Sequence, residues 1–310
     1  MVYNCLEIDW KCISHQIVRM LQGWYACSVM KIGIQGFEGS FHHQAAQQFF
    51  SGDFDLAPFE NFRQVFEALE TGMIDRAVVA IENSLYGSIN DTYDLLLQHK
   101  PWIVGEVYLH VRLDLLGTED AEMSDITDVY SQAPALGEAK LFLRENLPAV
   151  TQHEYPDTAM SARFVAKRAD RSMAAIASEM AGEIHGLQTL AEGIEDHKHN
   201  YTRFVILTKQ HRTTVESDKT SIILHTSHKP GALYRALGAF ANQDINLSKL
   251  ESRPVVDDTA WSHIFYLDFE AALNEAHAQE ALNEIADLGD EITVLGTYQS
   301  GTMPNGLIKS

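Results

Sequence analysis

A hydroxyl and a guanidinium stand side by side in residues 200–204, which read Asn-Tyr-Thr-Arg-Phe. They directly precede the apolar run 204–207, so we expect them at the mouth of a strand. A hydroxyl placed there can donate a hydrogen bond to a leaving group, and an arginine can form a forked pair with a carboxylate. Thr202 and Arg203 are therefore candidate site residues. The β-propensity of threonine is the alternative explanation for Thr202.

Polar residues also follow a second strand-like segment. Residues 81–90 (Ile-Glu-Asn-Ser-Leu-Tyr-Gly-Ser-Ile-Asn) carry a buried-looking run into a turn that contains a glycine. Polar groups at the carboxyl end of a strand are well placed to line a cleft. Asn83 and Ser84 are therefore candidate binding residues, and a helix cap at Asn90 or Asp91 is the alternative.

Two segments have the form of a helix start. In residues 36–40 (Gly-Phe-Glu-Gly-Ser), Ser40 can cap a helix, and such a turn directs backbone N–H groups at an anion. The glycines at 33, 36 and 39 do not fit the G-x-G-x-x-G pattern, so a dinucleotide loop is disfavoured and a plain tight turn is the alternative. In residues 155–159 (Tyr-Pro-Asp-Thr-Ala), Asp157 or Thr158 can begin a helix, and capping alone would explain either residue.

Histidine-containing segments raise the question of a metal. Residues 195–199 (Glu-Asp-His-Lys-His) contain groups that bind divalent ions, but no partner spacing such as H-E-x-x-H accompanies them. We therefore expect a solvated loop and no metal site. His42 and His43 lie on an expected helix with an apolar opposite face. We interpret them as surface or lobe-contact residues rather than catalytic ones.

The elements that would position these residues alternate between short β-type runs and longer helical runs from residue 30 to 209. This pattern predicts an α/β region of two lobes, 30–105 with 190–209 and 106–189, with a binding cleft between them. A polar linker is expected at 210–218. The order βαββαβ over 219–299 predicts a ferredoxin-like module, followed by a tail at 300–310. The strands expected in the two lobes are Lys31–Gln35, Ala77–Ile81, Ile103–Leu109, Asp128–Ser131, Ala174–Ala177 and Arg203–Leu207. The helices expected there are Phe41–Phe50, Phe62–Glu70, Thr92–Gln98, Leu136–Glu145 and Thr158–Arg168.

Charge and composition exclude several classes of function. The 43 acidic residues outnumber the 23 basic ones, and the formal net charge of -20 disfavours binding to nucleic acid or to an anionic membrane. No apolar run reaches the roughly 18 residues needed to cross a bilayer, so we expect a cytoplasmic protein. Cys5, Cys12 and Cys27 all precede Met30, which leaves the main body without a thiol for catalysis or metal binding. Residues 1–29 do not resemble a signal peptide; we expect an extension there, with Met30 as an alternative start.

In their order, these segments resemble the prephenate dehydratase family, from Met30 to about Tyr298. The most specific are residues 202–204 (Thr-Arg-Phe), residues 82–90, and residues 251–254 (Glu-Ser-Arg-Pro) in the last module. The resemblance implies a two-lobed catalytic region like a periplasmic binding protein, followed by an ACT regulatory domain. Leu113 and Gln132 depart from the family, which usually has histidines at or near these positions.

The resemblance also implies an activity and its residues. Members convert prephenate to phenylpyruvate with loss of water and carbon dioxide in phenylalanine biosynthesis, without a cofactor. By resemblance, Thr202 donates to the leaving hydroxyl. The substrate-binding residues so implied are Gly39, Ser40, Asn83, Ser84, Thr158, Arg203 and Phe204. L-Phenylalanine would bind between paired ACT domains of a homodimer or homotetramer and inhibit the enzyme. The residues implied for that site are Gly231, Ala232, Leu233, Glu251, Ser252, Arg253 and Pro254.

Two other interpretations stay open. Arogenate differs from prephenate only in carrying an amine where prephenate has a keto group, so an arogenate dehydratase is the nearest alternative. A non-catalytic ligand sensor is the second, although the presence of Thr202 argues against it. The segment before Met30 is too short for the chorismate mutase domain of the family's bifunctional members, so we expect a monofunctional enzyme.

Overall fold

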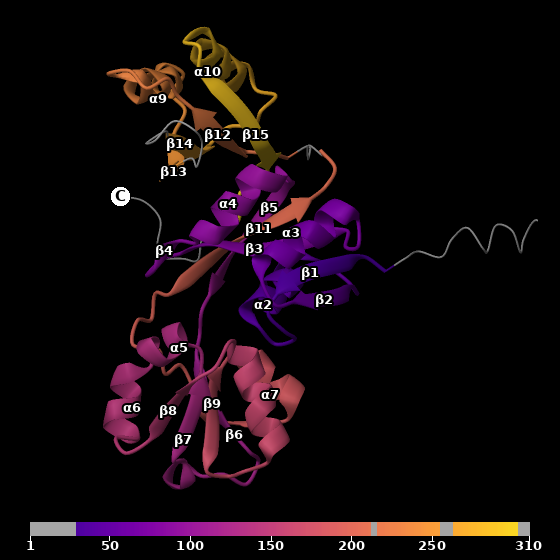
Figure 1. The fold of residues 1–310 in the computed structure, drawn as a ribbon, viewed down its shortest axis with the longest axis vertical. Coiled ribbons are helices and arrows are strands. Elements are labelled where there is room, and N and C mark those ends of the chain that lie inside the picture. Colours follow the sequence, from indigo (N-terminus) through magenta and orange to yellow (C-terminus); the bar gives the residue numbers. More distant parts are fainter. Residues whose placement is uncertain (1–28, 212–215, 255–262, 303–310) are drawn as a thin grey trace, which may run out of the picture.

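The computed structural model describes residues 29–211, 216–254 and 263–302, so nearly all of the expected extension 1–29 lies outside the described residues. Three β-sheets organise these residues: two belong to the α/β region and one to the C-terminal module (Figure 1). No described helix is long and apolar enough to cross a membrane.

The first lobe is built on a mixed sheet of apolar strands. Its central strands carry fully buried apolar residues such as Ile32, Ile34 and Val78. Such strands are stable only where helices cover both faces of the sheet. Helix α2 (Phe41–Phe49) covers one face, and α3 (Phe62–Thr71) and α4 (Asn90–His99) cover the other. In sheet order the strands are β2 (Asp55–Phe59), β1 (Lys31–Gln35), β3 (Arg76–Asn83), β11 (Tyr201–Thr208) and β5 (Trp102–His110), with β4 (Gly87–Ser88) beside β3.

The second lobe repeats this layered arrangement around a smaller sheet. One face packs against α5 (Ala133–Glu138) and α6 (Lys140–Asn146), and the other against α7 (Thr158–Arg168) and α8 (Glu179–His185). The single helix expected at 136–145 is divided at Ala139 into α5 and α6. In sheet order the strands are β10 (Gln188–Ala191), β6 (Asp114–Gly117), β9 (Met173–Ala177), β7 (Asp128–Ser131) and β8 (Thr151–Glu154), and a 3-10 turn η1 (Met123–Asp125) precedes β7.

Two short segments join the lobes, and they differ from the expected crossings. Gly105 lies inside β5, which continues to His110, and Leu190 lies inside β10 of the second sheet. The chain therefore crosses between β5 and β6 and returns between β10 and β11. The two crossings are tied together because the N–H of Val111 donates to the carbonyl of Asn200 at 2.8 Å. This pairing holds the start of β11 at the junction of the lobes.

The C-terminal module has the expected βαββαβ order. Its antiparallel sheet has α9 and α10 on one face (Figure 1). The other face contributes Ile223, Tyr266 and Leu295 to the core of the first lobe. The expected linker 210–218 lies between β11 and β12, and residues 212–215 of it are outside the described ranges. The elements are β12 (Lys219–His225), α9 (Ala232–Asn242), β13 (Leu247–Pro254), β14 (His263–Phe269), α10 (Ala276–Asp287) and β15 (Glu291–Tyr298).

A buried ionic cluster joins the module to the first lobe. The guanidinium of Arg203 on β11 lies 2.6 Å from a carboxylate oxygen of Glu106 on β5 and 2.6 Å from one of Asp268 on β14. Lys219 is 2.9 Å from the other oxygen of Glu106, and Arg203 also donates to the hydroxyl of Tyr298 at 3.1 Å. The two cations and two carboxylates balance in formal charge. This balance is needed because an unpaired buried charge strongly destabilises a fold.

Candidate active site

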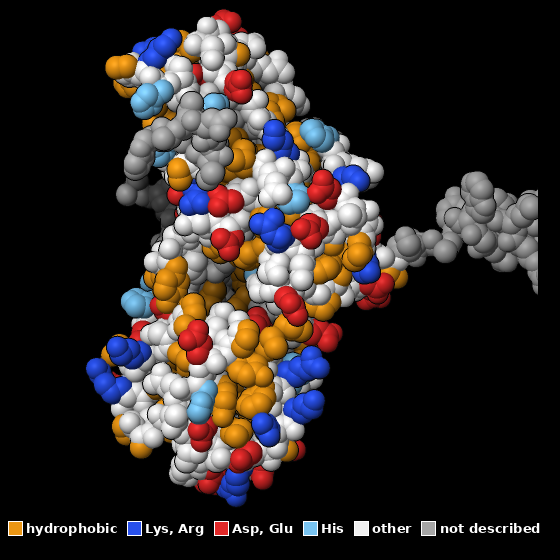
Figure 2. Space-filling view, viewed as in Figure 1, with side chains coloured by type: hydrophobic (Ala, Val, Ile, Leu, Met, Phe, Trp, Pro, Cys, Tyr) orange, Lys and Arg blue, Asp and Glu red, His pale blue; other side chains and the backbone are white. Residues whose placement is uncertain are grey.

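A cavity of about 300 Å³ lies between the two lobes, which is at the small end of the range for ligand sites. It is open to solvent, and Figure 2 shows apolar side chains gathered where the second lobe meets the first. Both lobes contribute to it. The lining residues are Gln35, Ser40, Phe41, His42, Phe62, Ala80, Asn83, Tyr86, Ile89, Val111, Leu113, Gln132, Pro134, Ala135, Glu138, Asp157, Thr158, Asn200, Thr202 and Phe204.

The hydroxyl of Thr202 is held by one neighbouring amide. Asn83 accepts the N–H groups of Leu85 and Tyr86 on its side-chain oxygen, at 2.9 and 3.1 Å, which fixes the direction of its NH2 group. That NH2 group donates to Thr202 Oγ1 at 2.9 Å and to Asn200 Oδ1 at 2.7 Å. Because Thr202 receives a hydrogen bond from Asn83, its own proton is free to be donated to a ligand in the cavity.

The first turn of α2 supplies neutral donors to the same cavity. Ser40 is the N-cap, and its hydroxyl accepts the N–H of His43 at 3.3 Å. The backbone N–H groups that begin the helix have no partner four residues earlier, so this end attracts an anion. On the second lobe, Asp157 caps α7 and accepts the N–H of Met160 at 2.9 Å, and Thr158 follows it. The capping carboxylate makes this second helix end less attractive to an anion.

His42 is an uncharged part of the cavity wall. Its Nε2 accepts the N–H of Ala80 at 3.2 Å, and burial lowers its pKa to about 3. The ring packs edge-on against Phe204, with centroids 4.9 Å apart. We expected His42 and His43 at the surface or at a lobe contact, but both are buried, with 9% and 8% exposed. A histidine pair followed by small residues on an expected amphipathic helix could equally have been read as its buried face.

Comparisons with known proteins place the chain in one family. The model of the family described as prephenate dehydratase matches residues 32–212, more than half of the chain. The chain belongs to the prephenate dehydratase family. Arogenate dehydratase 2 of Petunia hybrida is 36% identical over 288 residues, covering 88% of this chain and 72% of the relative. The bifunctional chorismate mutase/prephenate dehydratase of Aquifex aeolicus is 36% identical over 269 residues, covering 87% and 73%.

A solved structure of the same family shows the same fold. The prephenate dehydratase of Arthrobacter aurescens, in complex with L-Phe, has a TM-score of 0.78 and 26% identity, and the match covers 87% of this chain and 90% of that one. The family, the two-lobed fold and the C-terminal βαββαβ module predicted from the sequence are thus confirmed.

Five of the eight residues predicted for the dehydratase site line the cavity. They are Ser40, Asn83, Thr158, Thr202 and Phe204. Asn200 lines it as well, although it is not among the residues predicted from the sequence. Alternate residues of a strand face the same side, so the positions 200, 202 and 204 could have been grouped from the sequence.

The other three predicted residues have different positions. Arg203 does not line the cavity; it lies on the opposite side of β11 because side chains alternate, and it pairs with Glu106 and Asp268. The hydroxyl of Ser84 donates to the carbonyl of His199 at 3.1 Å, away from the lining. The N–H of Gly39, expected to face the substrate, donates to His43 Nδ1 at 3.1 Å instead.

Gly39 holds the two lobes close together. Its carbonyl accepts the hydroxyl of Ser178 at 2.7 Å, its φ is 86°, and a Cβ added to it would lie 2.7 Å from Cα of Ala181 on α8.

We expect Gly39→Val to lower kcat/KM by at least about tenfold, because it separates residues that must act from opposite lobes. Gly52→Val is the control, since Gly52 has a φ of 94° and nothing within 4 Å. Steady-state kinetics in which both variants lose activity equally would contradict a role in lobe contact.

The two departures from the family pattern both fall in the cavity wall. Leu113 and Gln132, at or near the positions where the resemblance implies histidines, both line it. Beside them, Tyr86 of the first lobe reaches across and donates to Glu138 of the second lobe at 3.0 Å. Neither Tyr86 nor Glu138 was selected from the sequence, because residues 52 positions apart give no local signal of contact.

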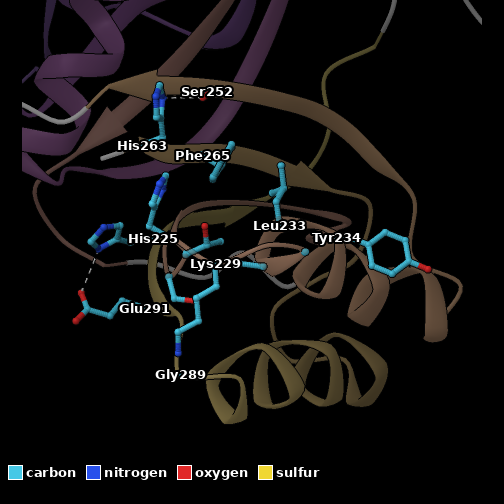
Figure 3. A pocket seen from close by; sticks show the side chains of 14 residues that line it. His225, Lys229, Leu233, Tyr234, Ser252, His263, Phe265, Gly289 and Glu291 are labelled. Carbon is cyan, nitrogen blue, oxygen red and sulfur yellow. Dashed lines mark hydrogen bonds and ion pairs between the residues drawn. The ribbon is translucent and has the colours of Figure 1, made fainter. Parts of the chain in front are cut away.

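A second cavity, of about 770 Å³, lies in the C-terminal module. Gly231, Ala232 and Leu233 at the start of α9 line one side, and Ser252 lines another. Figure 3 shows Ser252 and His263 joined on neighbouring strands, with Oγ and Nδ1 3.3 Å apart. Four of the seven residues predicted for an effector site thus meet at one cavity.

Of the other three predicted effector-site residues, Glu251 and Arg253 face the first lobe, and Pro254 lies at the end of β13. Glu251 accepts the hydroxyl of Ser88 at 2.6 Å, and Arg253 lies 2.8 Å from a carboxylate oxygen of Asp94. Pro254 ends the strand. The alternation of side chains along β13 explains why Ser252 faces the cavity whereas Glu251 and Arg253 do not.

Proposed function

We propose that this protein removes water and carbon dioxide from prephenate, or from its amino-acid form arogenate, in phenylalanine biosynthesis. The observation that carries the proposal is the Thr202 hydroxyl, which is fixed by Asn83 and can donate into an interlobe cavity. The family supports the coarser activity, and relatives named for each substrate are similar to the chain. From the sequence, prephenate is the first expected substrate and arogenate the second.

The chemistry needs little from the protein beyond position and one donor. As the bond between the ring and its carboxylate breaks, its electron pair enters the ring, the C4–O bond breaks, and the ring becomes aromatic. The departing hydroxyl needs a proton or a hydrogen bond to leave as water. Threonine is a very weak acid, so Thr202 acts as a hydrogen-bond donor or proton relay. Ser40 and the start of α2 are placed to hold a substrate carboxylate.

Direct turnover tests the proposal. Purified protein is incubated separately with prephenate and with arogenate, and phenylpyruvate is followed by absorbance and phenylalanine by chromatography. Formation of either product supports a dehydratase. If neither forms in well-folded protein, the non-catalytic sensor interpretation replaces it. The expected cytoplasmic location is a separate prediction.

We propose further that L-phenylalanine binds the cavity of the C-terminal module and inhibits the dehydratase. The relative from Arthrobacter aurescens was solved in complex with L-Phe. In this chain, Gly231 precedes α9 with a φ of 78°, so backbone N–H groups at the helix start are accessible to a carboxylate. The pairing of modules in a dimer or tetramer is part of this proposal, and size measurement by light scattering tests it.

Gly231→Val or Ser252→Leu should abolish inhibition and leave uninhibited turnover unchanged. Coupling between sites typically corresponds to a roughly 5- to 150-fold shift in response, which is the shift we expect phenylalanine to cause in the wild type. Gly72→Val is the matched control, because Gly72 has a φ of 77° and an open surrounding in the first lobe. Titration of activity and melting temperature with millimolar phenylalanine checks this. A wild type that ignores phenylalanine in both readouts would contradict the regulatory proposal.

A further inference from the structure

The interlobe cavity has an unbalanced charge. Glu138 and Asp157 contribute carboxylates to its lining, and none of the lining residues, all of which are described, is a lysine or arginine. His42 does not compensate, because burial keeps its pKa at about 3. A ligand with two carboxylates and no cation would bring its negative charge next to these carboxylates. Like charges held close together in a protein cleft repel one another more strongly than they do in bulk water.

The two carboxylates differ in what they can offer a ligand. Asp157 caps α7, and burial raises its pKa, so it favours the charged form less than an exposed carboxylate does. Glu138 is 7% exposed at the end of α5. One of its oxygens accepts the Tyr86 hydroxyl at 3.0 Å, and the other lies 3.2 Å from Nδ1 of His197, whose side chain is 64% exposed. An ionised carboxylate can accept about four hydrogen bonds, so Glu138 has capacity for another donor.

We infer that Glu138 binds the ammonium group of the substrate and makes the site selective for arogenate over prephenate. The inference rests on the proposed function and reverses the order of its two substrates. The start of α2 on the first lobe holds one carboxylate, and Glu138 on the second lobe holds the ammonium group. The keto group of prephenate has no proton to donate to Glu138. A buried polar group left without its partner discriminates strongly against such an analogue.

Steady-state kinetics with both substrates tests the inference. Glu138→Gln keeps the shape of the side chain and can still accept from Tyr86, but it removes the negative charge. We expect the wild type to prefer arogenate by at least about tenfold in kcat/KM. In Glu138→Gln this preference should fall by about 10- to 100-fold, because kcat/KM for arogenate decreases while kcat/KM for prephenate does not. A decrease of this size is typical for the loss of a hydrogen bond to a charged group. Since the two substrates are compared on one variant, a general loss of folded protein cancels from the ratio.

Two variants serve as controls. Tyr86→Phe removes a hydrogen bond to Glu138 and keeps its charge, so the preference should persist. Asp157→Asn removes the other cavity carboxylate, and the preference should persist there too. Loss of preference in Asp157→Asn but not in Glu138→Gln would overturn the assignment to Glu138. A wild type that turns over prephenate as well as arogenate would overturn the inference and leave the dehydratase function standing. Turnover of neither substrate would overturn both.

Discussion

Replacing Thr202 with alanine should lower kcat by about 100-fold or more and leave the fold intact. The loss of one positioned donor to a transition state typically has this size. Thr202 is 7% exposed, and the substitution removes a hydroxyl without enlarging a side chain, so the strand should persist. Thr202→Ser keeps the hydroxyl and should recover part of the activity. Stopped or continuous assays on whichever substrate the wild type accepts, together with circular dichroism, measure both effects.

A control for this variant exists on the same strand. Thr208 is also a buried threonine of β11, but its hydroxyl accepts from Arg76 at 3.1 Å, far from the cavity lining. Thr208→Ala should therefore leave kcat within about threefold of the wild type, since it touches no reacting group. Unchanged kcat in well-folded Thr202→Ala would remove Thr202 from the mechanism.

Removing one member of the ionic cluster should have the largest effect on stability. Asp268→Ala leaves Arg203 buried with one fewer carboxylate. Breaking a buried pair in this way typically costs about 3–5 kcal/mol of folding free energy. Burial by itself would lower the pKa of Arg203, but Asp268 and Glu106 raise it well above its ordinary value, so the guanidinium stays charged. Calorimetry or denaturant unfolding of Asp268→Ala should show the loss.

The comparison variant is an exposed ion pair in the second lobe. Arg171 pairs with Asp125, and the two side chains are 55% and 28% exposed. Arg171→Ala should leave the free energy of unfolding nearly unchanged, because water solvates both charges. If Asp268→Ala unfolds like the wild type, the cluster is not sealed between the module and the first lobe as described.

Local patterns were sufficient for most elements of the fold. The expected strands Lys31–Gln35 and Asp128–Ser131 coincide with β1 and β7, and helix 158–168 coincides with α7. Strands β2 and β6 were not predicted, because their local patterns are weak. β2 contains Pro58, which is tolerated there because β2 is an edge strand, and β6 is a four-residue buried run that periodicity cannot distinguish from helix.

The sequence by itself determined the family, the βαββαβ order of the C-terminal module and the candidate hydroxyl, Thr202. Those conclusions depend on short-range patterns: apolar periodicity, capping residues and ordered motifs. Only the tertiary structure decided which neighbours of Thr202 share its site. The alternation of a strand places Thr202 and Arg203 on opposite faces, but long-range pairing decides that one face meets a cavity and the other meets Asp268. The same holds for Glu138, whose contact with Tyr86 exists because two lobes close on each other, and no local pattern encodes that closure.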